Sequence, residues 1–148
     1  MIRTKTGLRI QFVAASYLLM LLAACSSQSR SATEWVIVKD TTPTGDGSVT
    51  YAAPSTIRKA GTKVSMWSMI DSTVMQSAGL DRPHFSWQDE WEYDCQAKRY
   101  RPVQFKEYSG KMGTGENVYS QAEPGYLWHE VRPGSVGETL WTMACGRE

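Results

Sequence analysis

The sequence predicts an α+β domain: an antiparallel β-sheet of about five to six strands with a C-terminal helix packed on it and one disulfide. Three observations support this fold class. Runs rich in β-branched and aromatic residues recur along the chain, separated by loops that contain Pro and Gly. One segment near the C-terminus has apolar residues at helical spacing. Two cysteines lie far apart in the chain, one after a predicted strand and one at the end of this helix.

The first 24 residues have the composition of a secretory signal peptide. Three basic residues and no acidic one precede a mostly apolar run at 12–22. This run has 11 residues, whereas a membrane-spanning helix needs roughly 20. The tetrapeptide Leu-Ala-Ala-Cys that ends at Cys25 resembles the lipobox of bacterial lipoproteins. The resemblance implies cleavage before Cys25 and attachment of fatty acyl groups, such as palmitate, to its sulfur and new amino group. An ordinary signal peptide with a chance cysteine is the alternative.

A lipidated Cys25 would anchor the protein to a membrane. Several acyl chains, at about 0.8 kcal/mol for each buried methylene, hold a protein firmly without a spanning helix. Ser26 follows the cysteine; since Asp there would resemble the inner-membrane retention signal, the resemblance points to the outer membrane. Residues 25–33 are nearly all polar and predict a flexible tether, and residues 34–148 are expected to form the folded domain.

Composition limits the kinds of partner. Removal of residues 1–24 takes three basic residues and no acidic one, which leaves 13 Lys and Arg against 15 Asp and Glu. Such a near-neutral chain gives no reason to expect nucleic-acid binding. After secretion and lipidation, two cysteines remain in an oxidising compartment, so a disulfide between Cys95 and Cys145 is expected. Two buried free thiols are the alternative.

The expected strands follow one another with short loops between them. Their residues are 34–40, 49–52, 63–75, 85–94, 98–108, 117–121 and 127–131. Pro54 and Gly61 bracket a segment that predicts a brief link between the second and third strands. In the third strand, Trp67 and Met69 interrupt the alternation, so either both faces of the sheet are partly covered or a bulge intervenes.

The clearest pattern begins at Phe85. Aromatic residues take one parity and polar residues the other, which is typical of a half-buried strand. A reversal at Gln96-Ala97 would pair this strand with the basic, aromatic segment that follows. The expected cross-strand pairs are Glu92–Arg101, Asp94–Arg99, Tyr93–Tyr100 and Phe85–Tyr108. Opposite charges then meet on one face and aromatic rings on the other, which favours a hairpin.

The C-terminal helix is expected to start at Ser135. Ser135 and Glu138 have the spacing of a capping box, in which the two side chains accept hydrogen bonds from free backbone N–H groups. The apolar stripe of the helix consists of Val136, Leu140, Met143 and Ala144. Cys145 lies at its end, so the expected disulfide would join the helix to the hairpin.

Several short motifs occur in order between residues 35 and 145. They are Trp35, Tyr51, Val64-x-Met66-Trp67, Asp94-Cys95, Arg99-Tyr100-Arg101, Tyr108-x-Gly110-x-Met112-Gly113-x-Gly115-Glu116, Trp128-x-x-Val131-x-Pro133-Gly134-Ser135-Val136-Gly137-Glu138 and Cys145. As a set they resemble the surface-adhesin E family of bacterial lipoproteins. The resemblance implies an antiparallel sheet with a flanking helix, a lipid anchor, exposure on the envelope and, as in some members, binding to host extracellular-matrix proteins.

No residue pattern indicates catalysis. His84 and His129 are the only histidines, and they lack the spacing of a metal-binding pair. Glu90, Glu92 and Asp94 share one strand face and could mimic a cation site, but the hairpin register gives two of them arginine partners. No Gly-x-Ser-x-Gly motif occurs. We therefore expect a protein that is not an enzyme, with no catalytic residues, no metal site and no cofactor.

The ligand-binding residues are unknown from the sequence. Candidates for a basic patch that binds an anionic polymer are Lys98, Arg99, Arg101 and Lys106, although cross-strand ion pairs explain them as well and are the favoured interpretation. The tryptophans at 35, 67, 91, 128 and 141 either fill the space between sheet and helix, as we expect for most of them, or belong to a binding surface.

We expect an adhesin-like protein of the envelope or cell surface that contacts host or environmental macromolecules, such as extracellular-matrix or other envelope proteins. The alternative is a periplasm-facing structural lipoprotein that supports envelope assembly. A sheet edge could also pair with a second copy of the chain to form a homodimer.

Overall fold

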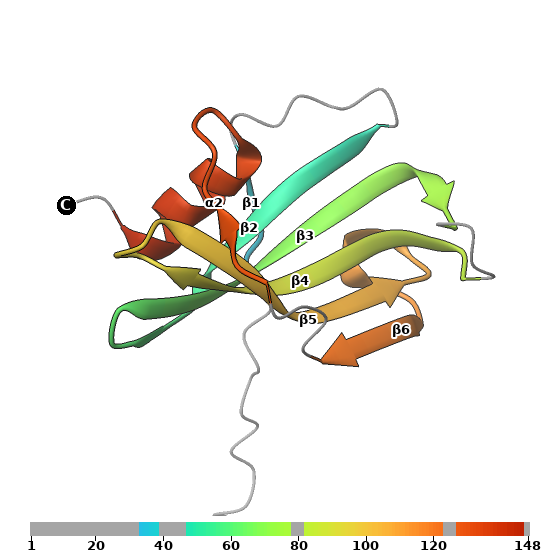
Figure 1. The fold of residues 1–148 in the computed structure, drawn as a ribbon. Helices are drawn as coiled ribbons and strands as arrows, with labels where there is room; N and C mark the ends of the chain where they lie inside the picture. The colour runs from blue at the N-terminus through green and yellow to red at the C-terminus, as the bar shows by residue number, and fades with distance from the viewer. Residues whose placement is uncertain (1–32, 39–46, 78–81, 123–126, 147–148) are drawn as a thin grey trace, which may run out of the picture. The chain divides into compact units, whose positions relative to one another are not determined.

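A twisted antiparallel sheet makes up most of the fold (Figure 1). The computed structural model describes residues 33–38, 47–77, 82–122 and 127–146. The strands are β1 (Val36–Ile37), β2 (Ser48–Ala60), β3 (Lys63–Gln76), β4 (His84–Asp94), β5 (Arg99–Tyr108), β6 (Asn117–Ala122) and β7 (His129–Glu130). A short 3₁₀ turn, η1 (Lys111–Gly113), and an α-helix, α2 (Val136–Cys145), complete the described elements. The predicted signal peptide, Cys25 and nearly all of the predicted tether lie outside these residues.

Strands β1 to β6 lie side by side in chain order, and each pairs antiparallel with the next. β6 pairs with the second half of β5, and β7 pairs with its first two residues, Arg99 and Tyr100. This arrangement confirms the predicted α+β fold of an antiparallel sheet with a C-terminal helix. None of the helices in the described ranges has the length and hydrophobicity that a membrane span requires.

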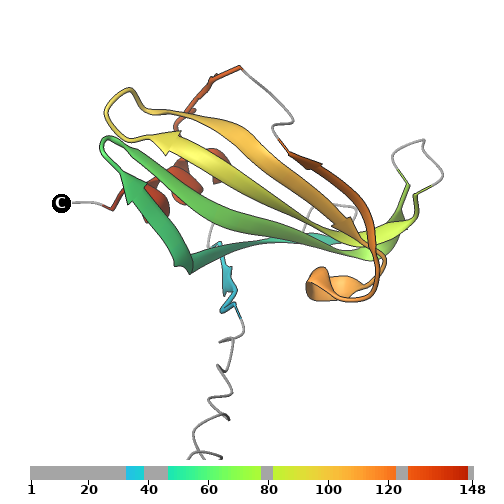
Figure 2. The same ribbon diagram turned by 90° about the horizontal axis from the view of Figure 1, so that it is seen from below.

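The helix α2 and the turn η1 lie on opposite sides of the sheet (Figure 2). We call the side that packs against α2 the helix face and the other side the opposite face. The core under α2 consists of Val38, Ala52, Val64, Met66, Tyr93, Leu140 and Ala144. The predicted disulfide is confirmed: Cys95 and Cys145 are bonded, with their Cα atoms 5.5 Å apart, and the bond ties the end of α2 to the turn between β4 and β5.

Both faces of β3 are covered, which decides between the two interpretations of its interrupted pattern. Met66 is fully buried on the helix face and Met69 is fully buried on the opposite face. Ser86 in β4 is buried on that opposite face as well, where its hydroxyl donates to the carbonyl of Gly110 at 2.6 Å and accepts from the amide of Gly113 at 2.9 Å. The loop that contains η1 therefore closes over a second, smaller buried region.

Gly113 is required at this contact. Its φ is +70°, and a Cβ there would lie 2.3 Å from the amide nitrogen of Gln88. A larger residue would strain the backbone and push the loop away from Met69 and Ser86.

The predicted link between the second and third strands is wrong, because β2 runs without a break from Ser48 to Ala60. The pairing of β2 with β3 changes register between Ala53 and Arg58. Pro54 has no N–H, so a regular ladder cannot continue through it. Thr56 replaces part of the ladder: its hydroxyl accepts from the amide of Trp67 at 3.0 Å and donates to the carbonyl of Ala53 at 2.6 Å. The chain thus bulges and then resumes the same strand.

The hairpin of β4 and β5 forms as predicted near its turn. The pairs Glu92–Arg101, Tyr93–Tyr100 and Asp94–Arg99 are confirmed. The fourth predicted pair is wrong, because Tyr108 lies opposite Ser86 rather than Phe85. Trp91 pairs with Pro102 and Glu90 with Gln104, which leaves one extra residue on β5. A bulge is favourable here because Pro102 cannot donate a ladder hydrogen bond.

The shortest elements differ from their predicted lengths. Of the strand expected at 34–40, only Val36–Ile37 forms β1, and residues 39–40 lie outside the described part of the chain. Of the strand expected at 127–131, only His129–Glu130 pairs, with β5. The helix starts as predicted: Ser135 accepts from the amide of Glu138 at 3.1 Å, and the Glu138 carboxylate accepts from the amide of Gly134 at 2.7 Å.

Candidate interaction surface

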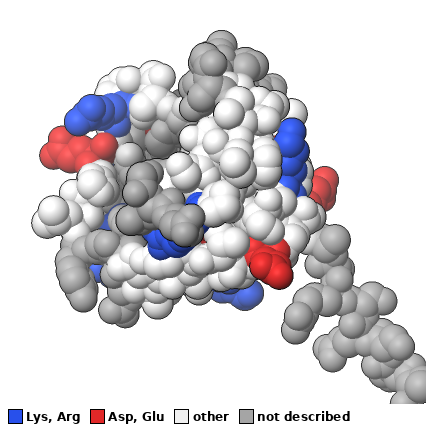
Figure 3. All heavy atoms as spheres, turned by 90° about the vertical axis from the view of Figure 1, so that its right-hand side faces the viewer, with Lys and Arg blue, Asp and Glu red and all other residues white. Residues whose placement is uncertain are grey.

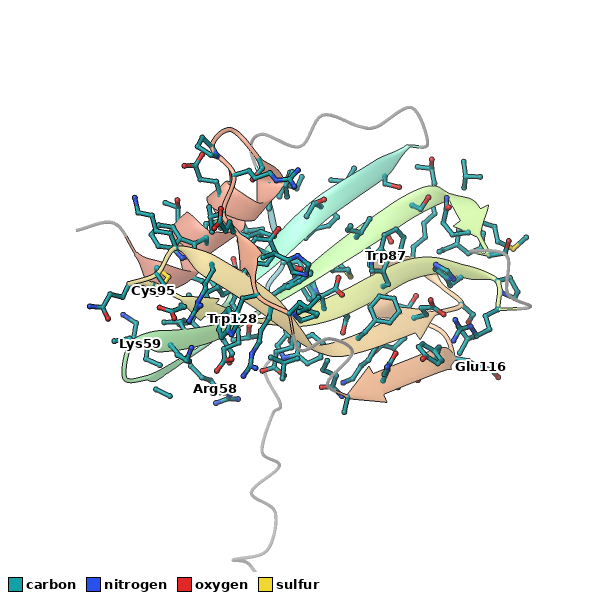
Figure 4. The ribbon with its side chains drawn as sticks, in the orientation of Figure 1. Arg58, Lys59, Trp87, Cys95, Glu116 and Trp128 are labelled. Atoms are coloured by element: carbon teal, nitrogen blue, oxygen red, sulfur yellow. A yellow bond between two sulfur atoms is a disulfide. The ribbon has the colours of Figure 1, made fainter. Side chains whose placement is uncertain are left out.

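Trp128 lies close to several cationic side chains on the opposite face of the sheet (Figure 4). The Nζ atom of Lys63 lies 4.0 Å from the centroid of the indole. The Cζ atoms of Arg99 and Arg101 lie 4.7 Å and 4.8 Å from it. We call these residues, together with Glu92 and Asp94, the Trp128 cluster. Cations beside an indole ring are attracted by its electron-rich face.

Strand pairing places these residues together. In β3, β4 and β5, Lys63 lies opposite Asp94, which lies opposite Arg99. The neighbouring row on the same face contains Ser65, Glu92 and Arg101. The cluster therefore combines residues from three adjacent strands, with Trp128 added by the segment that leads into β7.

Two carboxylates hold the cations in place. Asp94 accepts from Arg99 at 3.2 Å and from Lys63 at 3.4 Å. The amide of Ala97, 2.9 Å away, also donates to Asp94. The hydrogen bond from Ala97 is the largest cause of a lowered pKa of Asp94; Arg99 and Lys63 lower it further, against a smaller opposing effect of burial. Asp94 therefore stays ionised and keeps both cations beside Trp128.

The second carboxylate, Glu92, forms an ion pair with Arg101 at 2.6 Å. The three cations of the cluster nevertheless remain accessible, since 35% of the Lys63 side chain, 42% of Arg99 and 36% of Arg101 is exposed. Three positive and two negative groups leave the cluster with one excess positive charge. Its cations are thus ordered before any ligand arrives, and part of each faces solvent.

Further basic and aromatic groups extend this surface. Arg58 is exposed at the end of the row that contains Glu92 and Arg101, and it forms no ion pair with another described residue (Figure 4). Farther along the same face, the Nζ atom of Lys106 lies 4.7 Å from the centroid of a Trp67 ring. On the opposite face, the described residues therefore form two places where a cation lies over an indole.

Positive charge is not spread over the whole domain. The end that lies on the right of Figure 1 has mostly uncharged side chains, with Lys and Arg in small, separate groups (Figure 3). The Trp128 cluster is a local feature, in agreement with the near-neutral composition.

The four basic candidates from the sequence fall into three groups. Arg99 and Arg101 belong to the Trp128 cluster, where they also form the expected cross-strand ion pairs. Lys106 lies on the same face beside Trp67. Lys98 is exposed in the turn, at a φ of +51°, and it takes part in none of the ion pairs or cation–π contacts of the described cluster. The ion-pair and basic-patch interpretations are therefore compatible for the two arginines.

Sequence reasoning did not name Lys63 as a member of this surface, and it left Trp128 open between the space under the helix and a binding surface. Lys63 would follow from extending the hairpin register by one more strand, because it lies opposite Asp94. Trp128 had no such signal, since its position depends on the distant pairing of β7 with β5. The tryptophans also divide differently from the expectation: Trp91 and Trp141 pack against the core under α2, whereas Trp67 and Trp128 lie on the opposite face.

The histidines take separate positions. His84 is buried beside Glu107, with its Nδ1 atom 3.9 Å from that carboxylate. His129 contacts the ring of Tyr100 at 5.7 Å between centroids. Among the residues that the structure describes, no three His, Cys, Asp or Glu side chains come together as metal ligands.

Comparison with known proteins identifies the family. A sequence model of the family described as "Surface-adhesin protein E" matches residues 35–146. Two solved structures of Haemophilus influenzae protein E share the fold. Its selenomethionine form is 13% identical, with a TM-score of 0.53, over 77% of this chain and 90% of that one. Its crystal form II is 14% identical, with a TM-score of 0.51, over 65% of this chain and 79% of that one. No curated protein sequence matches the chain. The family match spans most of the chain, which therefore belongs to the surface-adhesin protein E family.

Proposed function

We propose that this adhesin-like surface protein is anchored to the bacterial outer membrane by a lipid on Cys25 and contacts host or environmental macromolecules through the Trp128 cluster, without catalysis. The family supports the adhesin-like role. The main evidence for placing the binding site here is the set of three partly exposed cations around Trp128.

The chemistry of the cluster suits a protein surface with exposed acidic groups. Trp and Arg are the residues most enriched among those that dominate binding energies. Arg99 and Arg101 are already held by carboxylates, so binding would order fewer side chains and lose less entropy. A guanidinium group also retains donors for a second carboxylate after forming one ion pair. An extracellular-matrix protein that presents carboxylates is the partner class we propose.

The binding test compares two single substitutions in the mature domain. Trp128→Ala removes the ring that gathers the cations, and a hot-spot loss of about 2 kcal/mol corresponds to roughly thirtyfold weaker binding to immobilised matrix proteins. Lys98→Gln is the matched control, because it removes an exposed positive charge outside the cluster. Its affinity should stay within about twofold of the wild type, and binding of the wild type should weaken as salt is raised. Equal losses for both variants, or no loss for Trp128→Ala, would contradict the proposed site.

The membrane anchor and orientation need separate measurements. Mass spectrometry of the mature protein should find residue 25 acylated and at the N-terminus; an unmodified cysteine would refute the anchor. Protease added to intact cells should digest the domain if it faces outward. Digestion only after lysis would refute surface display and support the alternative, a periplasm-facing structural lipoprotein.

A further inference from the structure

A cavity of about 300 Å³ lies between the helix face of the sheet and α2. It is separate from the Trp128 cluster, which lies on the other face of the sheet. Ser68, Asp89, Trp91, Tyr93 and Tyr100 line it from the sheet, and the first turns of α2 line it from the other side. The volume is at the lower end of the range for small-molecule sites, so an occupant would be small.

Three aromatic rings form one wall of this cavity. The centroids of Trp91 and Tyr100 are 5.3 Å apart, and their planes are nearly perpendicular at 77°. Tyr93 and Tyr100 follow at 6.2 Å. The indole N–H of Trp91 donates to the hydroxyl of Ser68 at 3.0 Å, which fixes the orientation of the ring. The wall is therefore built from ordered rings.

Asp89 is the one carboxylate among the described residues that line the cavity. It lies on the helix face of β4, at the same parity as Trp91 and Tyr93. Its carboxylate forms no hydrogen bond or ion pair with any residue that the structure describes. Burial raises the pKa of Asp89 to about 7. The hydroxyl of Tyr93 is also buried and has no hydrogen-bond partner in the described ranges. An unpartnered carboxylate at a cavity is unfavourable for folding, and it indicates a place where a ligand supplies the missing contact.

We infer that this cavity binds a small organic cation, of the quaternary ammonium class, with Asp89 as its counter-ion and Trp91, Tyr93 and Tyr100 as its aromatic wall. Rings that surround a methylated ammonium group attract it through their faces. A cation would also neutralise the carboxylate, which a neutral or anionic ligand cannot do. The inference does not depend on the proposed adhesin function, because it uses different residues on a different face.

The first test measures binding of choline by calorimetry and by the fluorescence of the tryptophans. The neutral comparison is 3,3-dimethylbutan-1-ol, which has the same shape with carbon in place of the charged nitrogen. At about pH 8, choline should bind the wild type at least about tenfold more tightly than the alcohol, because only choline is attracted by the carboxylate and the rings. Equal affinity for the two compounds, or no binding of choline, would overturn the inference.

Two variants locate the site. Asp89→Asn keeps the shape of the side chain and removes its charge, so the preference for choline over the alcohol should disappear. Glu90→Gln removes the neighbouring carboxylate, which points to the opposite face of β4, and should keep the preference. Circular dichroism confirms that both variants are folded. If Asp89→Asn retains the preference, or Glu90→Gln loses it, choline binds elsewhere and the inference fails.

A pH series gives an independent readout. Between about pH 8 and pH 6 the ionised fraction of an acid with a pKa near 7 falls about tenfold, and the affinity for choline should fall with it. Among the described lining residues the other titratable side chains are Tyr93 and Tyr100, and burial raises the pKa of the Tyr93 phenol further above this range. His129 contacts Tyr100 from outside the lining, so His129→Gln serves as the control. Loss of the pH dependence in His129→Gln would refute the role of Asp89.

Discussion

Replacement of Asp89 by Asn should remove a strong pH dependence of stability. Burial raises the pKa of Asp89 from 3.8 to about 7 in the folded protein. The folded state therefore binds more protons than the unfolded state between these two values, and the free energy of unfolding falls as pH rises from about 4 to about 7. The full difference of about three pKa units corresponds to about 4 kcal/mol at 1.4 kcal/mol per unit, an upper value because the cavity admits water.

Urea unfolding of the oxidised proteins at pH 5 and pH 8 measures this effect. Between pH 5 and the pKa of about 7, the wild type loses stability over about two pH units. The free energy of unfolding of Asp89→Asn, relative to that of the wild type, should therefore rise by up to about 3 kcal/mol from pH 5 to pH 8. The two histidines are present in both proteins, and their contributions cancel in the comparison. Glu90→Gln should follow the wild type. Parallel stability curves for the wild type and Asp89→Asn would refute the assignment of a buried, unpaired carboxyl.

Three further predictions concern contacts that hold the sheet together. Replacing both Cys95 and Cys145 by Ser removes a cross-link that closes a loop of about 50 residues, and should lower the free energy of unfolding by about 4 kcal/mol; wild type measured in reductant should show the same loss. Ser86→Ala leaves the partly buried amide of Gly113 without its acceptor and should lower the free energy of unfolding by about 1–3 kcal/mol, with faster hydrogen exchange at that amide; unchanged exchange would contradict this prediction. Thr56→Val removes the hydroxyl that replaces part of the ladder at the bulge of β2, and should lower the free energy of unfolding, measured in urea, by a similar amount. Thr56→Ser keeps the hydroxyl and should be about as stable as the wild type. Equal stability of the Val and Ser variants would show that the hydroxyl is unimportant.

The parts of the fold that follow from neighbouring residues were predictable. Alternation along β4 and the charges near its turn gave three of the four cross-strand pairs correctly. The fourth pair failed because one bulged residue shifts every later position on a strand. In β2, Pro54 correctly indicated an interruption of the hydrogen-bond ladder, but it did not indicate that the strand resumes after it. The strand continues because the hydroxyl of Thr56 takes the place of a backbone partner, which no local pattern predicts.

The buried polar residues show a second limit of pattern reasoning. Ser86 was expected on a solvent-facing side, yet the η1 loop covers it. A loop rich in glycine predicts a turn, but not the face on which the turn lies. Trp128 is similar, because its neighbours depend on how β7 returns to β5. Asp89 did carry a signal: it is the acidic residue on the aromatic parity of β4, and an interrupted pattern of this kind is expected at functional or strained positions.

The two candidate sites share one strand and remain chemically separate because of its pleat. Glu92 and Asp94 point to the opposite face and hold arginines beside Trp128. Asp89, Trp91 and Tyr93 point to the helix face and line the cavity under α2. The pKa values of the acids on the two faces consequently shift in opposite directions. Hydrogen bonds and cations lower the pKa of Asp94, whereas burial without a partner raises the pKa of Asp89. An ionised acid that holds cations in place suits an exposed recognition surface, and an acid that lacks a partner suits a cavity that binds a cation.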